Sequence, residues 1–171
     1  MGPRSRRRAT PGARRRAREL ALAGLYRADL LGLSAAEALE VLPEALALNL
    51  EEWPPEDRES AELREEALAY AARIVAGVSG SRDDIDQAIG TLSTDWPLDR
   101  LAAVDRAILR MALWELNEAV AAPAVVINEA VELAREYGGA ESAKFVNGVL
   151  GAWVKQRSLL SQSTLDDRPG T

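Results

Sequence analysis

The chain of 171 residues contains no cysteine and no histidine. Without cysteine there are no disulfides, thiolate nucleophiles, iron–sulfur ligands or zinc ribbons. Without histidine there is no Ser-His-Asp or Cys-His catalytic group and no ordinary zinc enzyme. Carboxylates, lysines, tyrosines and hydroxyls are left for chemistry, and their spacing shows no catalytic pattern. We therefore expect no enzymatic activity, no metal and no cofactor.

Long hydrophobic runs are also missing. The longest, Ala119 to Ile127, has nine residues and contains Pro123, whereas a membrane-spanning helix needs about 20. Near the N-terminus, only seven uncharged residues separate Glu19 from Arg27, which is the lower limit for a secretory signal. With 47% hydrophobic and 28% charged residues, the composition predicts a soluble globular protein, and we expect it in the cytoplasm, away from membranes.

Charge is divided unevenly along the chain. Residues 1–18 hold eight arginines and no acid, while the other 153 residues carry 13 basic and 27 acidic side chains. A basic segment of charge +8 thus precedes a body of charge −14, although the net charge is only −6. Arginine forks match phosphate oxygens and stack on bases, so this pattern favours, without proving, nucleic-acid binding.

The apolar residues follow helical spacing almost throughout, with no sustained alternation of period two. The pattern predicts an all-α fold of about seven helices in two small packed bundles. We expect a flexible arginine-rich arm at 1–13, a helical domain at 14–157 with sub-bundles at about 14–93 and 94–157, and a polar tail at 158–171. The expected helices cover about 15–31, 34–46, 59–78, 81–92, 101–116, 123–137 and 140–156, with a proline-rich connector at 49–59.

Helix ends explain two motifs that could suggest chemistry. Asp83, Asp84 and Asp86 begin an expected helix that Ser81 would cap, and acidic side chains are favourable there. They lack the spacing of a calcium loop. The segment Gly77-Val-Ser-Gly80 lacks the lysine and the preceding strand of a phosphate loop. We therefore assign both motifs to structure.

Three segments carry features beyond an ordinary helical core. Arginines lead directly into the first helix, whose free amides already favour anions. The central helix places Arg100, Arg106 and Arg110 beside an apolar stripe. Lys144 and Phe145 join a cation to a ring, the combination that single-stranded nucleic acid uses. Phe145 taken alone fits the core better, and the leucines beside Tyr26 in the first helix make the core a reasonable place for that ring as well.

Together these segments resemble the NusB transcription antitermination factors of bacteria. The resemblance covers most of residues 14–155 and is most specific in Lys144-Phe-Val-Asn-Gly-Val-Leu150. The other matching segments are Arg14-Arg-Arg-Ala-Arg18 with Tyr26, Val104-Asp-Arg-Ala-Ile-Leu-Arg110 and Ile127-Asn-Glu-Ala-Val-Glu-Leu-Ala-Arg135.

The resemblance implies an RNA-binding protein without catalysis that pairs with the ribosomal protein NusE and grips single-stranded boxA RNA. That complex would join the RNA polymerase antitermination complex and promote read-through of ribosomal RNA operons. Carried over by position, the family's RNA contacts fall on the arginine motif, two rings and a lysine, and its NusE contacts on an acid–base pair. The implied RNA-binding residues are Arg14, Arg15, Arg16, Arg18, Tyr26, Lys144 and Phe145, and the implied NusE-binding residues are Asp105 and Arg106.

Several features depart from the family pattern, and other interpretations stay open. The arginines at 4–8, the acidic connector and the C-terminal segment lie outside the resemblance, and Glu141 is an acid in a loop near the expected RNA. The same module resembles the N-terminal region of ribosomal RNA cytosine methyltransferases, whose catalytic domain this chain does not contain. A helical adaptor that binds no RNA is a third interpretation. The free protein could be a monomer or a homodimer.

Overall fold

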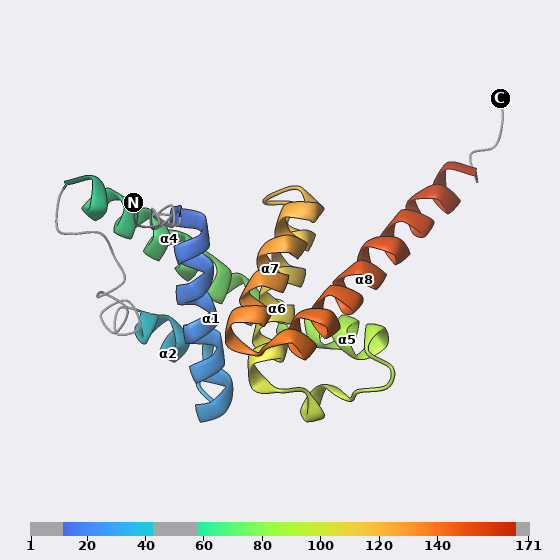
Figure 1. Ribbon diagram of the computed structural model, residues 1–171, viewed down its shortest axis with the longest axis horizontal. Coiled ribbons are helices and arrows are strands. Elements are labelled where there is room, and N and C mark those ends of the chain that lie inside the picture. The colour runs from blue at the N-terminus through green and yellow to red at the C-terminus, as the bar shows by residue number, and fades with distance from the viewer. Residues whose placement is uncertain (1–11, 43–57, 167–171) are drawn as a thin grey trace, which may run out of the picture.

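The computed structural model describes residues 12–42 and 58–166, and every regular element in these ranges is helical (Figure 1). The all-α prediction is confirmed. The helices are α1 (Ala13–Leu31), α2 (Ala35–Glu40), α4 (Arg58–Gly80), α5 (Arg82–Leu92), the 3₁₀ turn η2 (Leu98–Arg100), α6 (Ala103–Asn117), α7 (Pro123–Tyr137) and α8 (Ala140–Asp166). None of the described helices is long and apolar enough to cross a membrane.

Local capping chemistry sets several helix ends. Gly32 ends α1 in the left-handed region at φ 65°, where its N–H donates to the Ala28 carbonyl. Ser34 begins α2 with the predicted capping box: its Oγ accepts from the Glu37 N–H, and the Glu37 carboxylate accepts from the Ser34 N–H at 2.8 Å. The Ser34 hydroxyl also donates to the Glu37 carboxylate at 2.6 Å, and this bond together with that from the Ser34 N–H holds the pKa of Glu37 below its ordinary value. Ser81 precedes α5 but makes no side-chain cap, so that predicted cap is wrong.

The helices pack in two groups that share α6. On one side α1 packs against α4 and α2, and on the other α7 packs against α8 (Figure 1). The central helix α6 contacts both groups, and all its residues from Ala107 to Leu116 are buried. Helix α5, which we expected in the N-terminal sub-bundle, packs mainly on α6 and also contacts α8 and α4.

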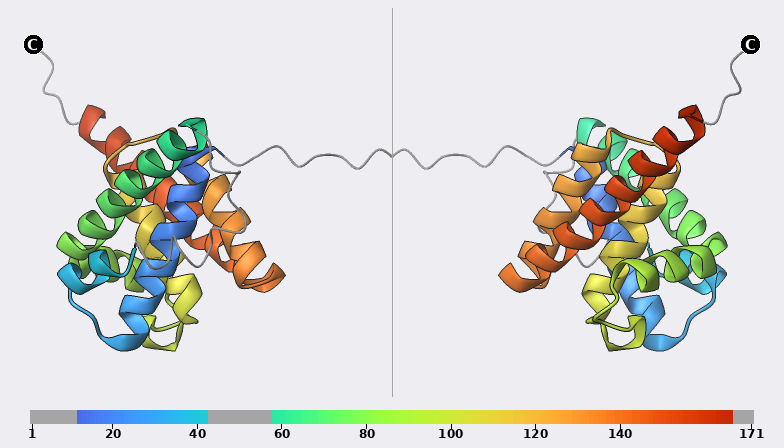
Figure 2. Two further views of the ribbon diagram at one scale, coloured as in Figure 1. Left: turned by 90° about the vertical axis from the view of Figure 1, so that its left-hand side faces the viewer. Right: turned by 90° about the vertical axis from the view of Figure 1, so that its right-hand side faces the viewer.

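Helix α8 is longer than the sequence suggested. It continues past residue 157 to Asp166 and projects beyond the other helices (Figures 1 and 2). No glycine or proline interrupts the chain between Gly151 and Pro169, so the helical hydrogen bonds continue although few apolar contacts support them. The expected polar tail is thus helical up to Asp166. Residues 1–11 of the expected arm, residues 43–57 of the second helix and the connector, and residues 167–171 lie outside the described ranges.

A cluster of ion pairs joins α1 to α5 and α6. The Asp29 carboxylate on α1 accepts hydrogen bonds from Arg106 and Arg110 on α6 and from Arg82 on α5. Arg110 also donates to Asp86 at 2.7 and 2.9 Å. Burial by itself would raise the pKa of Asp29, but the hydrogen bonds from Arg106 and Arg110 outweigh it and lower that pKa. The cluster fixes the start of α6 relative to α1.

Candidate nucleic-acid interface

Arg14 is the exposed arginine of the motif at the start of α1. Its guanidinium lies over the ring of Tyr70 on α4, 4.0 Å from the ring centroid. Such a cation–π contact is worth about 0.5–1 kcal/mol at an exposed site, and Arg14 also donates a hydrogen bond to the Tyr70 side chain. Tyr70 thus supports Arg14 at the point where the N-terminal segment leaves the helical domain.

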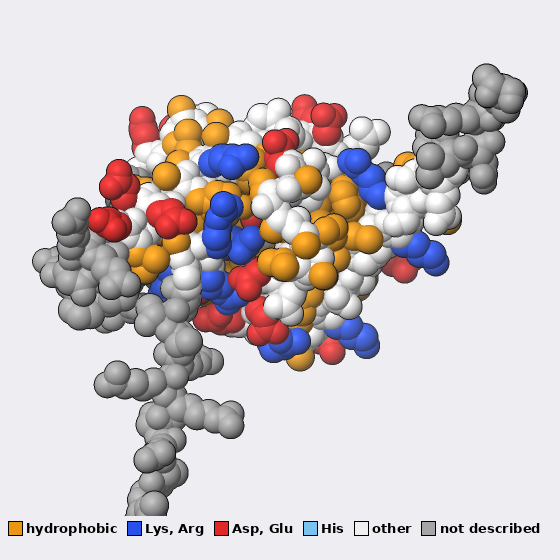
Figure 3. All heavy atoms as spheres, turned by 90° about the horizontal axis from the view of Figure 1, so that it is seen from above, with side chains coloured by type: hydrophobic (Ala, Val, Ile, Leu, Met, Phe, Trp, Pro, Cys, Tyr) orange, Lys and Arg blue, Asp and Glu red, His pale blue; other side chains and the backbone are white. Residues whose placement is uncertain are grey.

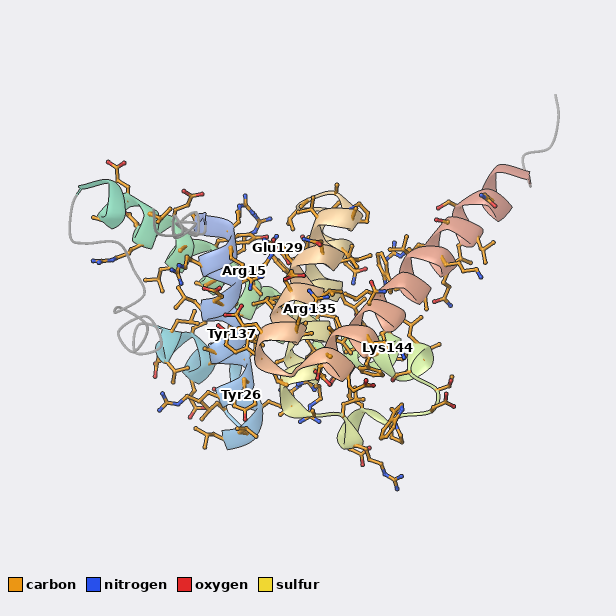
Figure 4. All side chains as sticks on the ribbon, in the orientation of Figure 1. Arg15, Tyr26, Glu129, Arg135, Tyr137 and Lys144 are labelled. Atoms are coloured by element: carbon orange, nitrogen blue, oxygen red, sulfur yellow. The ribbon has the colours of Figure 1, made fainter. Side chains whose placement is uncertain are left out.

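Arg15 and Arg16 are each paired with carboxylates of the same chain. Arg15 lies between α1 and α7, where it donates to Glu19 at 3.1 Å, to Glu136 at 2.8 Å and to Glu129 at 3.5 Å (Figure 4). Arg16 is only 7% exposed and donates to Glu19 at 3.2 Å. An RNA phosphate at Arg15 would have to share this guanidinium with three acids, whereas Arg16 presents little surface.

Arg18 is buried in the core, and the expectation that it contacts a phosphate requires a correction. It is 4% exposed, and its Nε donates to both carboxylate oxygens of Glu115 on α6 at 3.1 and 3.0 Å. Tyr70 donates its hydroxyl hydrogen to the same carboxylate at 2.5 Å. Burial and this carboxylate raise the pKa of Tyr70. Because the cation already has a dry, bidentate partner, its role is to fix α1 on α6.

Sequence reasoning missed the acids that hold these arginines. The sequence does indicate a buried ion pair at Glu115, because this acid lies within an apolar run on the central helix and a buried carboxylate needs a cation. Nothing in the sequence, however, shows that its partner is Arg18, which lies 97 residues away. Glu129 on α7 joins α7 to α1 through Arg15 at 3.5 Å and Arg18 at 3.8 Å.

A first cavity of about 420 Å³ opens between α1, the start of α6 and the end of α7. Tyr26 stands at its edge and is 40% exposed, so this ring is not a core residue. Tyr137 on α7 lines the same cavity and is 52% exposed. The lining residues are Arg16, Glu19, Leu20, Leu22, Ala23, Tyr26, Ala102, Ala103, Val104 and Tyr137. Two exposed rings thus flank an apolar hollow.

A second cavity, of about 470 Å³, lies between η2, the start of α6 and the start of α8. Lys144 is exposed at its rim, as Figure 4 shows, and Phe145 is half-buried with one face packed on the core. Across from them stands Trp96, which is 56% exposed. The lining residues are Trp96, Arg100, Leu101, Ala102, Asp105, Glu141, Ser142, Lys144 and Phe145. The structure therefore brings Lys144 and Phe145 together with a ring and a cation that sequence reasoning had not assigned.

The two cavities adjoin at the start of α6, because Ala102 lines both. Five of the seven predicted RNA-binding residues fall into three places, whereas Arg15 is paired between α1 and α7 and Arg18 lies in the core. Tyr26 and Arg16 lie at the first cavity, Lys144 and Phe145 lie at the second, and Arg14 lies on Tyr70. Ala102 thus joins the two cavities into one surface, with the exposed rings of Tyr26 and Tyr137 at the first cavity and the exposed cations Arg100 and Lys144 at the second. The opposite face, where α1 begins, carries basic side chains with acidic side chains beside them when it is seen from above (Figure 3).

Asp105 and Arg106, the expected partner-binding pair, point to different parts of the molecule. Asp105 is 8% exposed and contacts α8, where it accepts a hydrogen bond from Ser142. Burial raises the pKa of Asp105, and the Ser142 bond offsets this only in part. Arg106 points to α1 and binds Asp29. The two side chains therefore do not form one exposed patch.

Arg106 also determines the shape of the segment before α6. Its Nη1 donates to the carbonyls of Leu98 and Leu101 at 3.0 and 3.2 Å. These bonds close η2 against the helix and leave Asp99 and Arg100 exposed on it. Among the described residues, no group of three or more acids could hold a metal ion.

Comparison with known proteins gives a consistent family. The family model described as NusB matches residues 15–155. The transcription antitermination protein NusB of Symbiobacterium thermophilum is 41% identical over 145 residues, which cover 84% of this chain and 90% of that protein. The NusB protein of Myxococcus xanthus is 41% identical over 140 residues, covering 81% of this chain and 92% of that protein.

Solved structures agree with the sequence comparison. A chain in the crystal structure of antitermination factors NusB and NusE in complex with dsRNA superposes with a TM-score of 0.68 at 29% identity, covering 84% of this chain and 97% of that one. NusB of T. maritima superposes with a TM-score of 0.65 at 31% identity, covering 83% of this chain and 90% of that one.

Proposed function

Because the chain belongs to the NusB family, we propose that it is an RNA-binding transcription antitermination factor that works with a NusE-type ribosomal protein. Its ligand is single-stranded boxA RNA, and it acts by holding that RNA in the antitermination complex of RNA polymerase, in the cytoplasm. It does so by binding and not by catalysis. The solved complex of NusB and NusE with dsRNA supports this assignment by homology.

One structural observation carries the proposal: the continuous surface that runs from Tyr26 past Ala102 to Lys144 and Phe145. Single-stranded RNA is bound by rings on which bases stack and by cations that follow the backbone. Tyr26 and Phe145 supply rings, and Lys144 supplies an exposed cation. Arg14, supported by Tyr70, supplies a second cation at the start of α1.

Within the arginine motif, some side chains are proposed to contact RNA and others to stabilise the fold. We propose that Arg14 binds phosphate. We propose that Arg15 also binds phosphate, which then shares the Arg15 guanidinium with its acidic partners. Arg16 and Arg18 act through the fold, since both are buried against Glu19 and Glu115. The four arginines at 14–18 differ in exposure because helical periodicity turns successive side chains to different faces of α1.

The partner surface is proposed to be the start of α6 and the η2 turn. Arg106 acts there as a positioning residue, because it orders η2 through the Leu98 and Leu101 carbonyls. Asp99 and Arg100 are the charged side chains that a partner can reach on η2. An acidic body also suits a basic ribosomal protein, since complementary charge speeds association.

The test is a titration of labelled boxA RNA with the full chain, alone and with NusE. We expect binding by the chain alone and tighter binding with NusE. Lys144→Ala should weaken RNA binding, while Lys155→Ala, an exposed lysine further along α8, serves as the matched control. Co-elution with NusE without any RNA affinity would favour the helical adaptor and contradict the proposal.

A further inference from the structure

Arg15 faces more acidic side chains than one guanidinium can balance. It donates to Glu19, Glu129 and Glu136. Glu19 and Glu129 each pair with a second arginine of the motif at 14–18 as well, so both are held within the fold. The Glu136 side chain is 53% exposed, against 17% for Glu19 and 25% for Glu129. Because exposed ion pairs are weak, Glu136 is the partner that leaves Arg15 most easily and returns to water.

The contact between Glu136 and Arg15 has the form that a contact with an RNA phosphate takes. The Glu136 carboxylate accepts from Nη2 of Arg15 at 2.8 Å, which is the length of a charge-assisted hydrogen bond to a carboxylate or to a phosphate. A phosphodiester carries one negative charge, as the carboxylate does. Exchange of one for the other therefore leaves the charge facing Arg15 unchanged, and the phosphate then shares Arg15 with two acids instead of three.

The position of Glu136 places it beside the first cavity. It directly precedes Tyr137, whose exposed ring lines that cavity together with the ring of Tyr26. Glu19, another partner of Arg15, lines the cavity as well. Figure 4 shows Arg15, Tyr137 and Tyr26 in this order from the start to the end of α1. A strand whose bases stack on these rings therefore brings its phosphates to the edge of the cavity beside Glu136.

We propose that the Glu136 carboxylate occupies a phosphate site on Arg15 in the free protein, and that RNA binds this site by displacing it. The proposal rests on the RNA-binding function proposed above and adds a competing group from the protein itself. A lone small anion has to displace the carboxylate without any gain from stacking. Glu136 thus favours a strand that brings phosphates and stacking bases together.

The experiment is a double-mutant cycle on the full chain, in which the affinity for labelled boxA RNA is measured at one salt concentration. We expect Glu136→Gln to bind RNA about threefold to fivefold more tightly than the wild type, because loss of an exposed ion pair changes an equilibrium by a factor of about five at most. In an Arg15→Gln background the same substitution should change the affinity by less than about twofold, since only screened repulsion between Glu136 and RNA is then removed. Each gain is a ratio within one background, so a loss of stability caused by Arg15→Gln cancels.

Glu132→Gln is the matched control, because Glu132 lies one turn earlier on α7, is exposed at 48% and pairs with Arg135 instead. It removes the same charge from the same helix, and its effect on RNA affinity should be equal in the two backgrounds. An equal gain from Glu136→Gln in both backgrounds overturns the inference, because general charge repulsion would then explain it. Weaker RNA binding by Glu136→Gln overturns it too, since the carboxylate would then orient Arg15 towards RNA.

Failure of this inference and failure of the proposed function give different results. If the wild-type chain and every variant bind no boxA RNA, the RNA-binding function itself is wrong. If all of them bind RNA and the cycle shows no coupling, the RNA-binding function stands and Glu136 does not occupy a phosphate site. A change in NusE affinity at unchanged RNA affinity would mean that Glu136 serves the protein partner, and the inference would be wrong in that case as well.

Discussion

At the scale of single residues, Gly77 shows how one missing side chain shapes the core. It lies within α4 with its Cα facing the indole of Trp114, and a Cβ added there would come 2.0 Å from Trp114 Nε1. Gly77→Ala must therefore displace a buried ring, and we expect a loss of about 1–3 kcal/mol in the free energy of unfolding. Urea denaturation followed by circular dichroism measures it.

Gly90→Ala is the matched control, because Gly90 lies inside α5 and a Cβ there meets nothing within 4 Å. That variant should gain about 0.4–1 kcal/mol from the lower entropy of its unfolded chain. Equal effects of the two substitutions would mean that Trp114 does not restrict this position.

A second prediction concerns the buried carboxylate of Glu115, which is 1% exposed. Glu115→Gln leaves the buried Arg18 guanidinium with only the longer ion pair to Glu129, at 3.8 Å, and weakens the bond from Tyr70. Removing one partner of a buried ion pair costs about 3–5 kcal/mol, and urea denaturation should show a loss of that size. Glu118→Gln on the surface of the same helix should change stability by less than about 0.5 kcal/mol. A similar small change in Glu115→Gln would contradict the buried pair.

Residues that act locally were predictable from sequence, and residues that act across the fold were not. The Ser34 capping box needs only its partner three positions away, and the structure contains it. The exposure of Tyr26 could not be predicted, because the leucines beside it in α1 favour the core equally well. The burial of Arg18 depends on Glu115, which only tertiary packing brings near.

At the scale of elements, the ion cluster around Asp29 holds α1 against α5 and α6. Arg106 and Arg110 lower the pKa of Asp29 despite its burial. A carboxyl whose pKa is lower in the folded state adds stability above its unfolded pKa of ~3.9, and that stability is lost as the pH falls through the folded value. Asp29→Asn should therefore cost about 3–5 kcal/mol at neutral pH.

The difference between the wild type and Asp29→Asn should begin to shrink as the pH falls below ~3.9, because the unfolded wild-type chain then takes up a proton at this carboxyl. It should disappear once the pH is also below the lowered pKa of the folded protein, where both states are protonated. Thermal melts of both proteins from neutral pH to acid measure this difference. A difference that stays constant down to the lowest pH would mean that the ionised carboxylate does not join these helices.

Element ends were predicted best where a glycine, a proline or a cap marked them. Pro123 begins α7 and Gly32 follows α1, as expected. The predicted end of α8 was wrong. The polar composition of the C-terminal residues was interpreted as the end of the helix, although a serine hydroxyl in a helix can donate to the carbonyl four residues before it. Ser158 and Ser161 do so at 3.1 and 3.0 Å.

At the scale of the whole molecule, the division of charge governs how RNA is held. Residues 1–11 contribute four arginines, and the motif at 14–18 contributes four more, of which Arg16 and Arg18 are buried. We expect the full chain to neutralise about four to six phosphates. The logarithm of its RNA affinity should then fall with the logarithm of salt concentration at a slope near −3 to −4, at ~0.7 per single-strand phosphate.

Deleting residues 1–11 should reduce that slope to between about 0 and −1, because the four lost arginines account for most of the released counterions at ~0.7 each. Deleting residues 167–171, which contain one acid, Asp167, and one base, Arg168, should leave it unchanged. Filter binding at several salt concentrations gives the slope for each chain. Without residues 1–11, the helical domain would then bind RNA chiefly through stacking of bases on its exposed rings, and its affinity would depend little on salt concentration. An equal slope for the full and N-terminally shortened chains would show instead that the phosphates are neutralised within the helical domain.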